Sequence, residues 1–584
     1  MHQPTAEPRR SIYYQYRVHT PAPLPQPDAA YAPVVIAGAG PAGLVTALNL
    51  ARQGVRSVLL ESQLQVSEGS RAIVFTRRSM EILQQVGVAD AVLRDALPWR
   101  CGNSFYRGRQ VFRMEAPHDA DQRFFPMTNL QQQYLEEYLF DAVAAEPLIE
   151  LRWGHVLTRI VRHDGIGDGA GEGACAEFEV DTPAGPYLQR ADWLVAADGA
   201  RSGIRQMLDL RMEGASYEGR FVIADIRIDL PLPTERLAFF DPDWNPGNTV
   251  LMHREPHGIW RIDYQLPAGE TPEQALAFES LKSRIDAQLA SIGHGDKSWE
   301  LDWCSVYSAR AMTLPDYVAG RVVFVGDAAH MLPIFGVRGA NTGFQDAQNL
   351  GWKLGLVARG VAPPALLASY SSERVAAARE IVDEAGKSTR FMTPPSRGYR
   401  LLRDAVLSLS LTEAFVRPLF HWRTSRPHTH ADSALNDPAD DNALFGAGPA
   451  QGAPLPNLRL GADEFLLDHL CGAAAGAFTL LVCPPTGGFD AALRECLAAW
   501  RARGVSLRLL QIGPQVSATD AESMPDTAPD GWLPDTDGAL RRHLGLPGAG
   551  AAYLLRPDQH VCARWLRLTP EQLDAALQRA LALA

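Results

Sequence analysis

Glycines and a carboxylate near the start of the chain have the types and spacing needed to bind a dinucleotide. The sequence GAGPAG places Gly38, Gly40 and Gly43 directly after the apolar run 33–37, and Glu61 ends the next apolar run. The first two glycines let the backbone turn and approach a pyrophosphate, while Gly43 lets a helix pack closely on a strand. Glu61 can accept from an adenosine ribose hydroxyl, a role that a purely structural glycine turn does not explain.

A second stretch, residues 321–354, also combines a carboxylate with a predicted helix N-terminus. The apolar, β-branched run 322–325 is typical of a buried parallel strand. Asp327 follows it, a loop rich in glycine and proline comes next, and a helix is expected to begin near Asn341. The carboxylate can accept from a polyol, and the helix end offers unpaired N–H groups and a positive dipole. Taken alone, the stretch is equally compatible with an ordinary strand–loop–helix unit.

A third polar turn follows the expected strand 193–196. Asp198 and Gly199 stand there, before a predicted helix at 204–208. Polar turns therefore follow three expected strands, after residues 37, 196 and 325. Because open α/β sheets bind ligands at the carboxyl ends of their strands, the three turns are expected to line one site.

Composition restricts the class of protein. At 584 residues, with 46% hydrophobic and 21% charged residues, the chain is expected to form two or three globular domains. A formal net charge of −12 argues against nucleic acid or an anionic membrane as a partner. The seven cysteines are scattered, without a CxxC pair or zinc spacing, and no apolar signal segment opens the chain. We therefore expect a cytoplasmic protein with reduced thiols and no metal.

The expected elements that position these residues divide the chain into five parts. Period-two strands interrupt the dinucleotide-binding part and indicate an inserted, mostly antiparallel sheet. A strand–helix–strand order near the end indicates a small α/β domain. The predicted parts are an N-terminal arm at 1–30, a discontinuous dinucleotide-binding domain at 31–215 and 308–395, the sheet at 216–307, a helical region and linker at 396–453, and the final domain at 454–584.

Together these motifs resemble the class A flavin-dependent aromatic hydroxylases, the p-hydroxybenzoate-hydroxylase-like FAD monooxygenases. The resemblance rests on GAGPAG with Glu61, the Asp198-Gly199 turn, and the run from GDAAH to NLGWKL, and it covers about residues 31–390. The chain is more similar to the phenol and 3-(3-hydroxyphenyl)propionate hydroxylase branch, whose members end in a thioredoxin-like domain. The resemblance implies an α/β fold with a Rossmann-like FAD-binding domain, an inserted substrate sheet and this C-terminal domain.

The redox motif of thioredoxin is missing from the C-terminal part. Cys483 is followed by two prolines rather than by a second cysteine in a CxxC. A structural or assembly role is therefore expected for the domain, and thiol–disulfide exchange is not.

The resemblance also implies which residues bind FAD. Glu61 matches the ribose acceptor, Asp327 the aspartate that binds the ribitol, and Asp198-Gly199 a motif linked to both FAD and reduced nicotinamide. From the residues alone, Arg71 and Gln132 are either solvated surface groups or contacts of the nucleotide. The full implied set is Gly38, Gly40, Ala42, Gly43, Glu61, Arg71, Gln132, Val156, Asp198, Gly199, Asp327, Pro333, Gly339, Ala340 and Asn341.

The flavin loop departs from the family pattern. Family members often have a second proline and small or amide residues where this chain has Ile334, Val337 and Arg338. Two interpretations of Arg338 remain open: a solvent-facing residue, which we favour, or a positive charge near the reduced flavin.

The implied reaction is hydroxylation of an aromatic, phenolic substrate. By resemblance, NADH or NADPH reduces FAD, O2 gives a flavin C4a-hydroperoxide, and one oxygen atom passes to the ring. A base or strong acceptor near the phenol would make the ring more nucleophilic. The expected substrate sheet offers four candidates for catalysis: Arg261, Asp225, His253 and Tyr264.

Each of these candidates has an alternative interpretation. Asp225 shares a strand face with Arg227 and Asp229, a pattern that favours a solvent-exposed face over substrate contact. By resemblance, Arg261 corresponds to an arginine associated with flavin movement and nicotinamide reactivity. His253 and Tyr264 are otherwise ordinary residues of the sheet.

Other functions make different predictions. A flavin reductase or dehydrogenase of the same superfamily would be expected to carry a second nicotinamide-binding GxGxxG and a CxxC or CxxxxC motif, and this sequence has neither. A non-catalytic flavoprotein would not consume O2 with any phenol. A hydroxylase of larger polycyclic or N-heteroaromatic rings is a further alternative. We expect a homodimer that takes a small aromatic substrate and O2.

Overall fold

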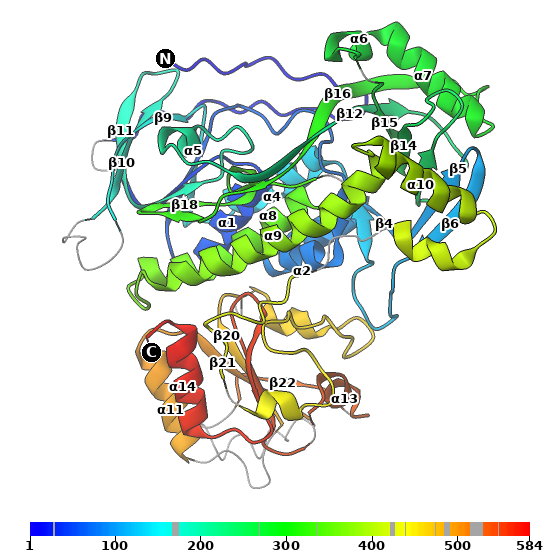
Figure 1. Cartoon of the computed structure of the whole chain (residues 1–584). Helices are drawn as coiled ribbons and strands as arrows, with labels where there is room; N and C mark the ends of the chain where they lie inside the picture. Colours follow the sequence, from blue (N-terminus) through cyan, green and yellow to red (C-terminus); the bar gives the residue numbers. More distant parts are fainter. Residues whose placement is uncertain are drawn as a thin grey trace.

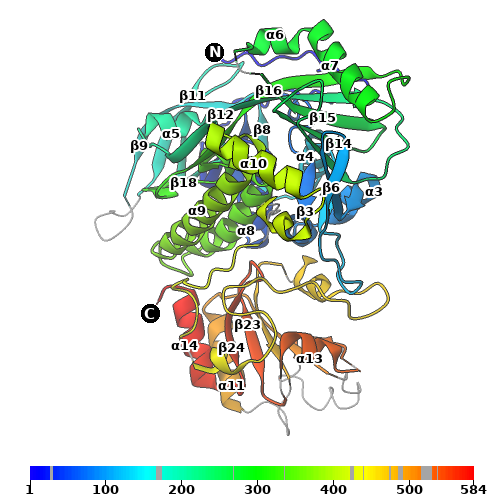
Figure 2. The same ribbon diagram turned by 45° about the vertical axis from the view of Figure 1, so that its right-hand side comes forward.

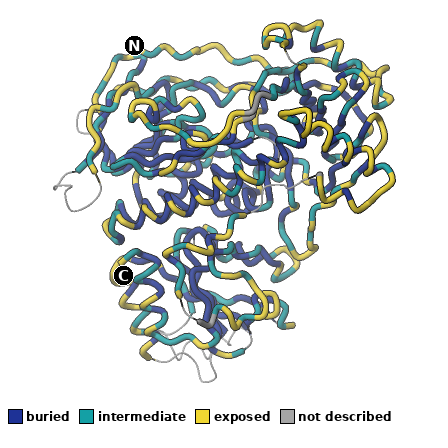
Figure 3. The backbone as a smooth tube through the Cα atoms, viewed as in Figure 1, coloured by how far each residue is buried: buried dark blue, intermediate teal, exposed yellow. Residues whose placement is uncertain are grey.

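The chain forms an FAD-type α/β domain, a broad second sheet above it and a separate C-terminal domain below (Figure 1). The computed structural model describes residues 1–26, 30–165, 174–267, 269–333, 336–420, 427–438, 440–472, 475–483, 491–513, 529–535, 537–546 and 548–583. Figure 2 shows the same three parts after a turn of 45° about the vertical axis. Apolar side chains gather inside each layer, as the dark tube in Figure 3 indicates.

The first sheet is parallel at its centre, as the apolar runs of the sequence predict. Its order is β17-β18-β11-β1-β2-β8, with β10 and β9 added antiparallel beside β11. β1 pairs in parallel with both β11 and β2, so the polar turns after these strands lie at one edge. The strands are β1 (Tyr31–Ala37), β2 (Ser57–Glu61), β8 (Ile149–Trp153), β9 (Val156–His163), β10 (Ala176–Asp181), β11 (Tyr187–Ala196), β17 (Val318–Ala319) and β18 (Val322–Phe324).

Two helices that begin at the site run side by side because glycines remove the side chains between them. α1 (Pro41–Arg52) and α8 (Gly339–Ala358) are in close contact. A Cβ atom added at Gly351 would lie 2.4 Å from Asn49, and one added at Gly355 would lie 2.4 Å from Gln53. The contact positions increase along both helices together, so the helices are parallel. Their N-termini, 300 residues apart in sequence, therefore point the same way.

The second sheet has order β19-β16-β12-β15-β14-β13-β5-β6 and is antiparallel except for the pair β13–β5. It extends beyond the expected segment 216–307, because it includes β5, β6, the first residues of β12, the last residues of β16, and β19. Its strands are β5 (Cys101–Tyr106), β6 (Arg109–Glu115), β12 (Glu213–Arg227), β13 (Arg236–Phe240), β14 (Thr249–Arg254), β15 (Ile259–Gln265), β16 (Glu300–Thr313) and β19 (His330–Met331). α6 (Pro272–Leu276) and α7 (Phe278–Ser291) cover its outer face.

Smaller elements connect the two sheets. β3 (Val74–Thr76), β4 (Leu97–Trp99) and β7 (Met127–Asn129) form a three-stranded sheet. The helices around them are α2 (Arg77–Gln85), α3 (Ala89–Asp95), α4 (Gln132–Ala144), α5 (Gly203–Met207), α9 (Leu366–Met392) and α10 (Arg397–Leu409), followed by the 3-10 helix η3 (Ala414–Phe420).

The N-terminal arm packs on its own chain. Ser11 and the Ile12 N–H both donate to Asp302, each at 2.7 Å. Gly69 N–H donates to the Tyr16 hydroxyl at 3.0 Å, close to Arg71 in sequence. The arm thus connects the second sheet with the loop that follows β2 (Figure 1).

The C-terminal domain contains a five-stranded sheet of order β22-β21-β20-β23-β24, with two antiparallel strands beside three parallel ones. This arrangement agrees with the expected thioredoxin-like α/β order. The short strands β22 and β24 were not predicted. Its elements are β20 (Phe478–Val482), α11 (Ala491–Ala502), β21 (Leu507–Ile512), β22 (Gly531–Leu533), α13 (Ala539–Leu544), β23 (Ala552–Leu555), β24 (Val561–Trp565) and α14 (Pro570–Ala580).

The loop between β23 and β24 fastens this domain to the FAD-type domain through buried charges. Arg556 donates to Glu373 of α9 at 2.7 Å and to Asp558 at 2.6 Å. Lys353 of α8 lies 2.8 Å from Glu373, and Arg78 of α2 donates to the backbone oxygen of Asp558 at 2.8 Å. All five side chains are at most 4% exposed. We call Arg78, Lys353, Glu373, Arg556 and Asp558 the interdomain cluster.

Candidate active site

The turn between β1 and α1 has the shape of a pyrophosphate cradle. Gly38 has φ +108, and a Cβ there would lie 2.4 Å from the Ala197 carbonyl oxygen. A Cβ at Gly43 would lie 2.0 Å from the Gly38 carbonyl oxygen, whereas nothing lies within 4 Å of one at Gly40. Gly38 and Gly43 are thus required for packing, and Gly40 faces open space. No side chain caps the N-terminus of α1, so its N–H groups are available to an anion.

Glu61 lies at the end of β2, beside this turn. Its carboxylate accepts from the Ala39 N–H at 3.0 Å and from the Gln63 N–H at 2.8 Å. Burial raises the pKa of Glu61. The His155 N–H donates to the Glu61 backbone oxygen at 2.9 Å, which brings Val156, the first residue of β9, next to the end of β2.

Asp327 follows β18, in the 3-10 helix η2 (Gly326–Ala328). Its side chain is exposed to solvent, yet the protein around it desolvates the carboxylate and raises its pKa. Among the described residues, no donor reaches its oxygens. A carboxylate that is accessible, surrounded by protein and free of protein donors fits the hydroxyls of a ribitol chain.

Residues that sequence reasoning did not single out hold this turn in place. Asp346 of α8 accepts from the Gly326 N–H at 3.2 Å, lies 2.5 Å from His330 Nε2, and pairs with Arg374 at 2.7 Å. Although burial favours its neutral form, His330 and Arg374 lower the pKa of Asp346. The signal for Asp346 was present, because it belongs to the DAQNL segment of the predicted helix.

The N-terminus of α8 faces the same region and is fixed by one amide. Asn341 accepts from the Thr76 N–H at 2.8 Å and from Ser79 at 2.6 Å, and it donates to the Val74 and Val337 oxygens, each at 2.9 Å. Its side chain thus fastens β3 and α2 to α8. The backbone of Gly339 and Ala340 begins the helix without a side-chain cap, so N–H groups there remain available to a ligand.

The loop before α8 differs from one expectation. Pro333 is buried, and Ile334, one of the departures from the family pattern, lies outside the described residues. Arg338 is 5% exposed, so the favoured interpretation of a solvent-facing arginine is wrong. Val337 has φ +56, a left-handed conformation that is rare for a β-branched residue and concentrates at functional sites.

Arg71 and Gln132 lie together beside the cofactor turn. Gln132 accepts from the Ala72 N–H at 3.1 Å and donates to Glu136 at 2.7 Å, so it is a buried structural contact of the loop. Arg71 is exposed and has φ +23. Its side chain donates from Nε to the Glu68 backbone oxygen at 3.4 Å and is otherwise open to solvent.

The Asp198-Gly199 turn follows β11 at the same edge. Asp198 accepts from the Ile204 N–H at 3.1 Å, and burial raises the pKa of its carboxyl group. Gly199 has φ +78, which glycine adopts without strain. The turn is continuous with Ala197, whose carbonyl contacts Gly38.

On the inner face of the second sheet, an arginine joins this sheet to the cofactor loop. Arg261 of β15 donates to Asp225 of β12 at 2.9 Å and to the Arg71 backbone oxygen at 2.7 Å, and it also reaches Ser70. Asp225 is 0% exposed, so the favoured solvent-facing interpretation of this residue is wrong. Arg227 and Asp229 are exposed as the alternation predicted, but Asp225 itself is buried against the arginine.

Three further polar side chains share this face and have unmet hydrogen-bonding capacity. Glu255, Asp263 and His253 are at most 6% exposed. Within the described residues, both Glu255 oxygens, one Asp263 oxygen and His253 Nδ1 have no hydrogen-bond partner. Burial raises the pKa of Glu255 well above its usual range and that of Asp263 to about 7, and it lowers that of His253 well below its usual range. We call Ser70, Asp225, His253, Glu255, Arg261 and Asp263 the sheet cluster.

Tyr264 is not part of this cluster. Along β15, Arg261 and Asp263 point to the inner face, whereas Trp260, Ile262 and Tyr264 pack against α7 on the outer face. The Tyr264 ring lies under the guanidinium of Arg284, 5.5 Å away. The strand alternation therefore separates Tyr264 from the other three predicted catalytic residues.

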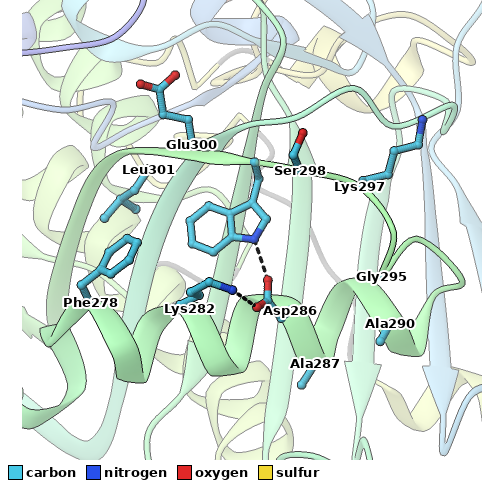
Figure 4. Close-up of a pocket in the computed structure, with 11 residues that line it drawn as sticks. Phe278, Lys282, Asp286, Ala287, Ala290, Gly295, Lys297, Ser298, Glu300 and Leu301 are labelled. Carbon is cyan, nitrogen blue, oxygen red and sulfur yellow. Dashed lines mark hydrogen bonds and ion pairs between the residues drawn. The ribbon is translucent and has the colours of Figure 1, made fainter.

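A hollow of about 960 Å³ lies elsewhere, between α7 and the start of β16 (Figure 4). Phe278, Lys282 and Trp299 line it, and Trp299 donates to Asp286 at 2.8 Å. It opens on the outer side of the second sheet, away from the cofactor turns. Among the described residues, no group of His, Cys, Asp and Glu is arranged to hold a metal ion. No helix in the described ranges is long and apolar enough to cross a membrane.

The residues present fit FAD. The uncapped N-terminus of α1, the open space at Gly40 and the carboxylate of Glu61 suit an adenosine diphosphate half. Asp327 and the uncapped N-terminus of α8 suit a ribitol and a ring that carries negative charge. Because α1 and α8 are parallel and in contact, the sites for the two halves of FAD are adjacent.

Comparisons with known proteins agree with this geometry. The model of a family described as an FAD binding domain matches residues 31–385. The 3-(3-hydroxy-phenyl)propionate/3-hydroxycinnamic acid hydroxylase of Mycolicibacterium smegmatis is 27% identical over 547 residues, 93% of this chain and 92% of that protein. The protein of the same description from Klebsiella pneumoniae is 28% identical over 568 residues, 96% of each chain.

Solved structures share the fold over nearly the whole chain. The flavin-dependent monooxygenase PieE, in complex with FAD and substrate, has a TM-score of 0.76 at 24% identity, over 95% of this chain and 99% of that one. The aklavinone-11 hydroxylase, with FAD and aklavinone, has a TM-score of 0.72 at 24% identity, over 94% and 99%. The family match covers more than half of the residues, and the chain therefore belongs to this family of FAD-binding proteins.

Proposed function

We propose that this protein is an FAD-dependent monooxygenase that uses NADH or NADPH and O2 to hydroxylate an aromatic, phenolic substrate. The observation that carries the proposal is the juxtaposition of one long cofactor site with a buried cluster of unpaired polar groups. Arg261 joins the two through its bonds to Asp225 and the Arg71 backbone. A flavin site that needed only to pass electrons would not require such a cluster above it.

When bound, FAD supplies electron transfer from the nicotinamide and activation of O2. The proposed FAD contacts are those expected from the sequence, and Gln132 and Asn341 act by holding the loops rather than by touching the ring. The uncapped N-terminus of α8 would offer N–H groups to negative charge on the flavin. The second sheet excludes water from the space between itself and the flavin site.

The chain's own residues orient the substrate. Burial opposes a charge on Glu255 and on His253, raising the pKa of the first well above its usual range and lowering that of the second well below its usual range. A neutral, polar wall can bind phenolic hydroxyl and carbonyl groups without the cost of desolvating a full charge. Asp225 keeps Arg261 in place, and Asp263, with a pKa of about 7, is the group best matched to accept a phenolic proton. Arg261, Asp225 and His253 are proposed as active-site residues, and Tyr264 is left out.

The substrate class rests on the relatives. Two curated relatives are named as hydroxylases of 3-(3-hydroxy-phenyl)propionate or 3-hydroxycinnamic acid, both small phenols. The structure of aklavinone-11 hydroxylase contains a polycyclic substrate, so a larger ring system is the second candidate. We also propose a homodimer, a cytoplasmic location consistent with seven free cysteines, and the domain boundaries expected from the sequence.

The test is a substrate panel. Phenols, hydroxyphenylpropionates, polycyclic phenols and N-heteroaromatics are offered with NADH or NADPH, and nicotinamide oxidation, O2 uptake and product mass are recorded. The proposal expects at least one phenol to stimulate oxidation and to gain one oxygen atom. A reductase would oxidise the nicotinamide with an electron acceptor and leave every ring unchanged, and that result would overturn the proposal.

A matched pair of variants locates the substrate. His253→Asn removes a polar group from the inner face of the sheet, so the KM for the phenol should rise about ten-fold. Tyr264→Phe removes a hydroxyl from the outer face, so its KM should remain that of the wild type. Equal effects of the two substitutions would mean that the substrate does not bind below the sheet cluster.

A further inference from the structure

The N-terminal arm binds the loop that follows β2, residues 62–71, which we call the β2 loop. Within its described residues the arm has no helix or strand, so contacts with the rest of the chain hold it in place. The Arg9 N–H donates to Gln65 at 3.0 Å, and the His19 N–H donates to the Leu64 oxygen at 2.7 Å. The arm and the β2 loop therefore run together over much of the length of the loop.

Gly69 is the position at which both the arm and the second sheet contact this loop. The Gly69 N–H donates to the Tyr16 hydroxyl at 3.0 Å. A Cβ atom added at Gly69 would lie 2.3 Å from the indole of Trp303, a residue of β16. Gly69 has φ +72, and two residues later Arg71 has φ +23, which is uncommon for a residue other than glycine. The backbone just before Arg71 is thus closely confined.

A second anchor fixes the arm beside the sheet cluster. The Ser11 hydroxyl and the Ile12 N–H both donate to Asp302, each at 2.7 Å. Asp302 precedes Trp303, and Trp303 lies opposite Asp225 in the pairing of β16 with β12. Burial raises the pKa of Asp302, and the nearby charge of Asp225 raises it further. One segment of chain is therefore attached both to the β2 loop and to the edge of the sheet cluster.

The two ends of the β2 loop carry proposed contacts of the cofactor. Glu61, the proposed ribose acceptor, precedes the loop, and Arg71 is its last residue. Burial raises the pKa of Asp327, and the charge of Arg71 acts in the opposite direction, so Arg71 lies near the proposed ribitol contact. A shift of about 1 Å in a group that positions a reactant can lower the rate about a hundred-fold. The conformation of this loop is therefore important for the reaction.

We propose that the N-terminal arm is a strap that keeps the β2 loop in its FAD-binding conformation, with Tyr16 as the positioning residue. Tyr16 acts on Arg71 through the backbone of Gly69. The arm lies outside residues 31–385, which the family model matches, so the strap is an addition to the matched domain. The proposal rests on the FAD site described above. It adds that the cofactor loop and the substrate sheet are held by one segment, because Asp302 anchors the same arm.

Tyr16→Phe removes only the hydroxyl that accepts from Gly69. The amide hydrogens of the β2 loop should then exchange about five-fold faster, with or without FAD, as mass spectrometry would record. Titration of the apoprotein should show FAD binding weakened about five-fold. With a phenol that the wild type hydroxylates, the amount of product formed per nicotinamide oxidised should fall.

Tyr14→Phe is the matched control on the same arm. The Tyr14 hydroxyl donates to Glu137 of α4 rather than to the β2 loop. Its removal should leave loop exchange and FAD affinity at the wild-type values. Equal effects of the two substitutions, or unchanged loop exchange in Tyr16→Phe, would overturn the role assigned to Tyr16.

A double variant tests whether the two anchors act as one strap. Asp302→Ala removes the second anchor, and loss of either anchor should release the same segment. Tyr16→Phe combined with Asp302→Ala should therefore bind FAD about as weakly as the more affected single variant. Fold changes that multiply would mean two independent contacts and would overturn the strap. If the loop responds as expected but the wild type hydroxylates no phenol, the proposed reaction is wrong and the strap stands.

Discussion

Two regions of this molecule bury an arginine between carboxylates, and the pKa values of those carboxyl groups shift in opposite directions. In the interdomain cluster, Arg556 and Lys353 satisfy Glu373, and Arg556 also satisfies Asp558. Although burial opposes charge, these cations hold the pKa of both carboxyl groups well below the usual range. In the sheet cluster, Arg261 pairs with Asp225, whereas burial raises the pKa values of Glu255 and Asp263.

The difference separates a site that is complete from one that awaits a ligand. A buried ion pair contributes to structure only when every lone pair and proton has a partner. The interdomain cluster meets that condition at both carboxylates, with Arg78 Nε its one unpaired group among the described residues, and it joins three helices to the C-terminal domain. The sheet cluster does not meet it, and Arg261 of this cluster contacts the loop at Ser70 and Arg71. Satisfaction of buried polar groups thus distinguishes the two regions better than burial does.

Breaking the complete cluster should have the largest effect. Glu373→Gln would leave Arg556 and Lys353 buried without a full countercharge, so the free energy of unfolding should fall by about 3–5 kcal/mol. The shift in the denaturant midpoint measures this loss. Arg109→Ala, on an exposed strand position, is the control and should stay within about 0.5 kcal/mol of the wild type. A small effect of Glu373→Gln would show that the cluster does not hold the domains together.

Titration of the incomplete cluster should be visible as a pH dependence. Asp263 binds its proton more tightly in the folded state, with a pKa of about 7, than in the unfolded chain, where the value is 3.8. Its contribution to stability is therefore full at acid pH and is lost as the pH rises through about 7. Between pH 5 and pH 7 the wild type should lose about 2–3 kcal/mol relative to Asp263→Asn. Parallel stability profiles of the two proteins would contradict this assignment.

Removing the accessible carboxylate should affect the ligand rather than the fold. Asp327→Ala should weaken FAD binding about ten-fold or more, since a hydrogen bond to a charged group contributes about 1.5–3 kcal/mol. The flavin content of the purified protein and a titration of the apoprotein measure the change. Asp229→Ala, at an exposed position, removes an equal charge and should keep its flavin. Full flavin content in Asp327→Ala would count against the ribitol contact.

The smallest expected effect is also the most direct comparison of the two regions. Glu255→Gln makes the same atomic change as Glu373→Gln, but it replaces a carboxyl group whose pKa burial raises well above the usual range, so burial opposes its charge. The free energy of unfolding should therefore change by less than about 1 kcal/mol. Substrate KM should move while the denaturant midpoint does not. If both glutamates gave the same loss of stability, the two clusters would not differ in kind.

The local motifs of the cofactor site could be predicted because they depend on near neighbours in sequence. Strand, glycine turn and helix follow one another at Gly38–Gly43, and the same holds at Asp327–Asn341. The sequence also indicated the parallel first sheet and the C-terminal α/β domain. Asp346 could have been predicted in the same way, since it lies in α8 about one turn after Asn341.

Long-range partners could not be predicted in the same way. A strand in which charged and apolar residues alternate has the same sequence pattern whether its polar face contacts water or an arginine on the next strand. Asp225 was misassigned because Arg261, its partner, lies 36 residues away. Register decided the outcome for Tyr264, because the side chain two positions after Ile262 necessarily shares its apolar face. The interdomain cluster joins residues about 180–480 positions apart, and no local pattern reports such a pairing.

The strand order of the first sheet has a consequence for synthesis on the ribosome. β1 is translated first, but its neighbour β11 emerges about 150 residues later, roughly 10–30 s at ordinary elongation rates. Until then one edge of an apolar strand is unpaired, and such an edge invites association with other chains. Nascent chains should therefore need a chaperone during this interval, and fragments that end before residue 196 should aggregate.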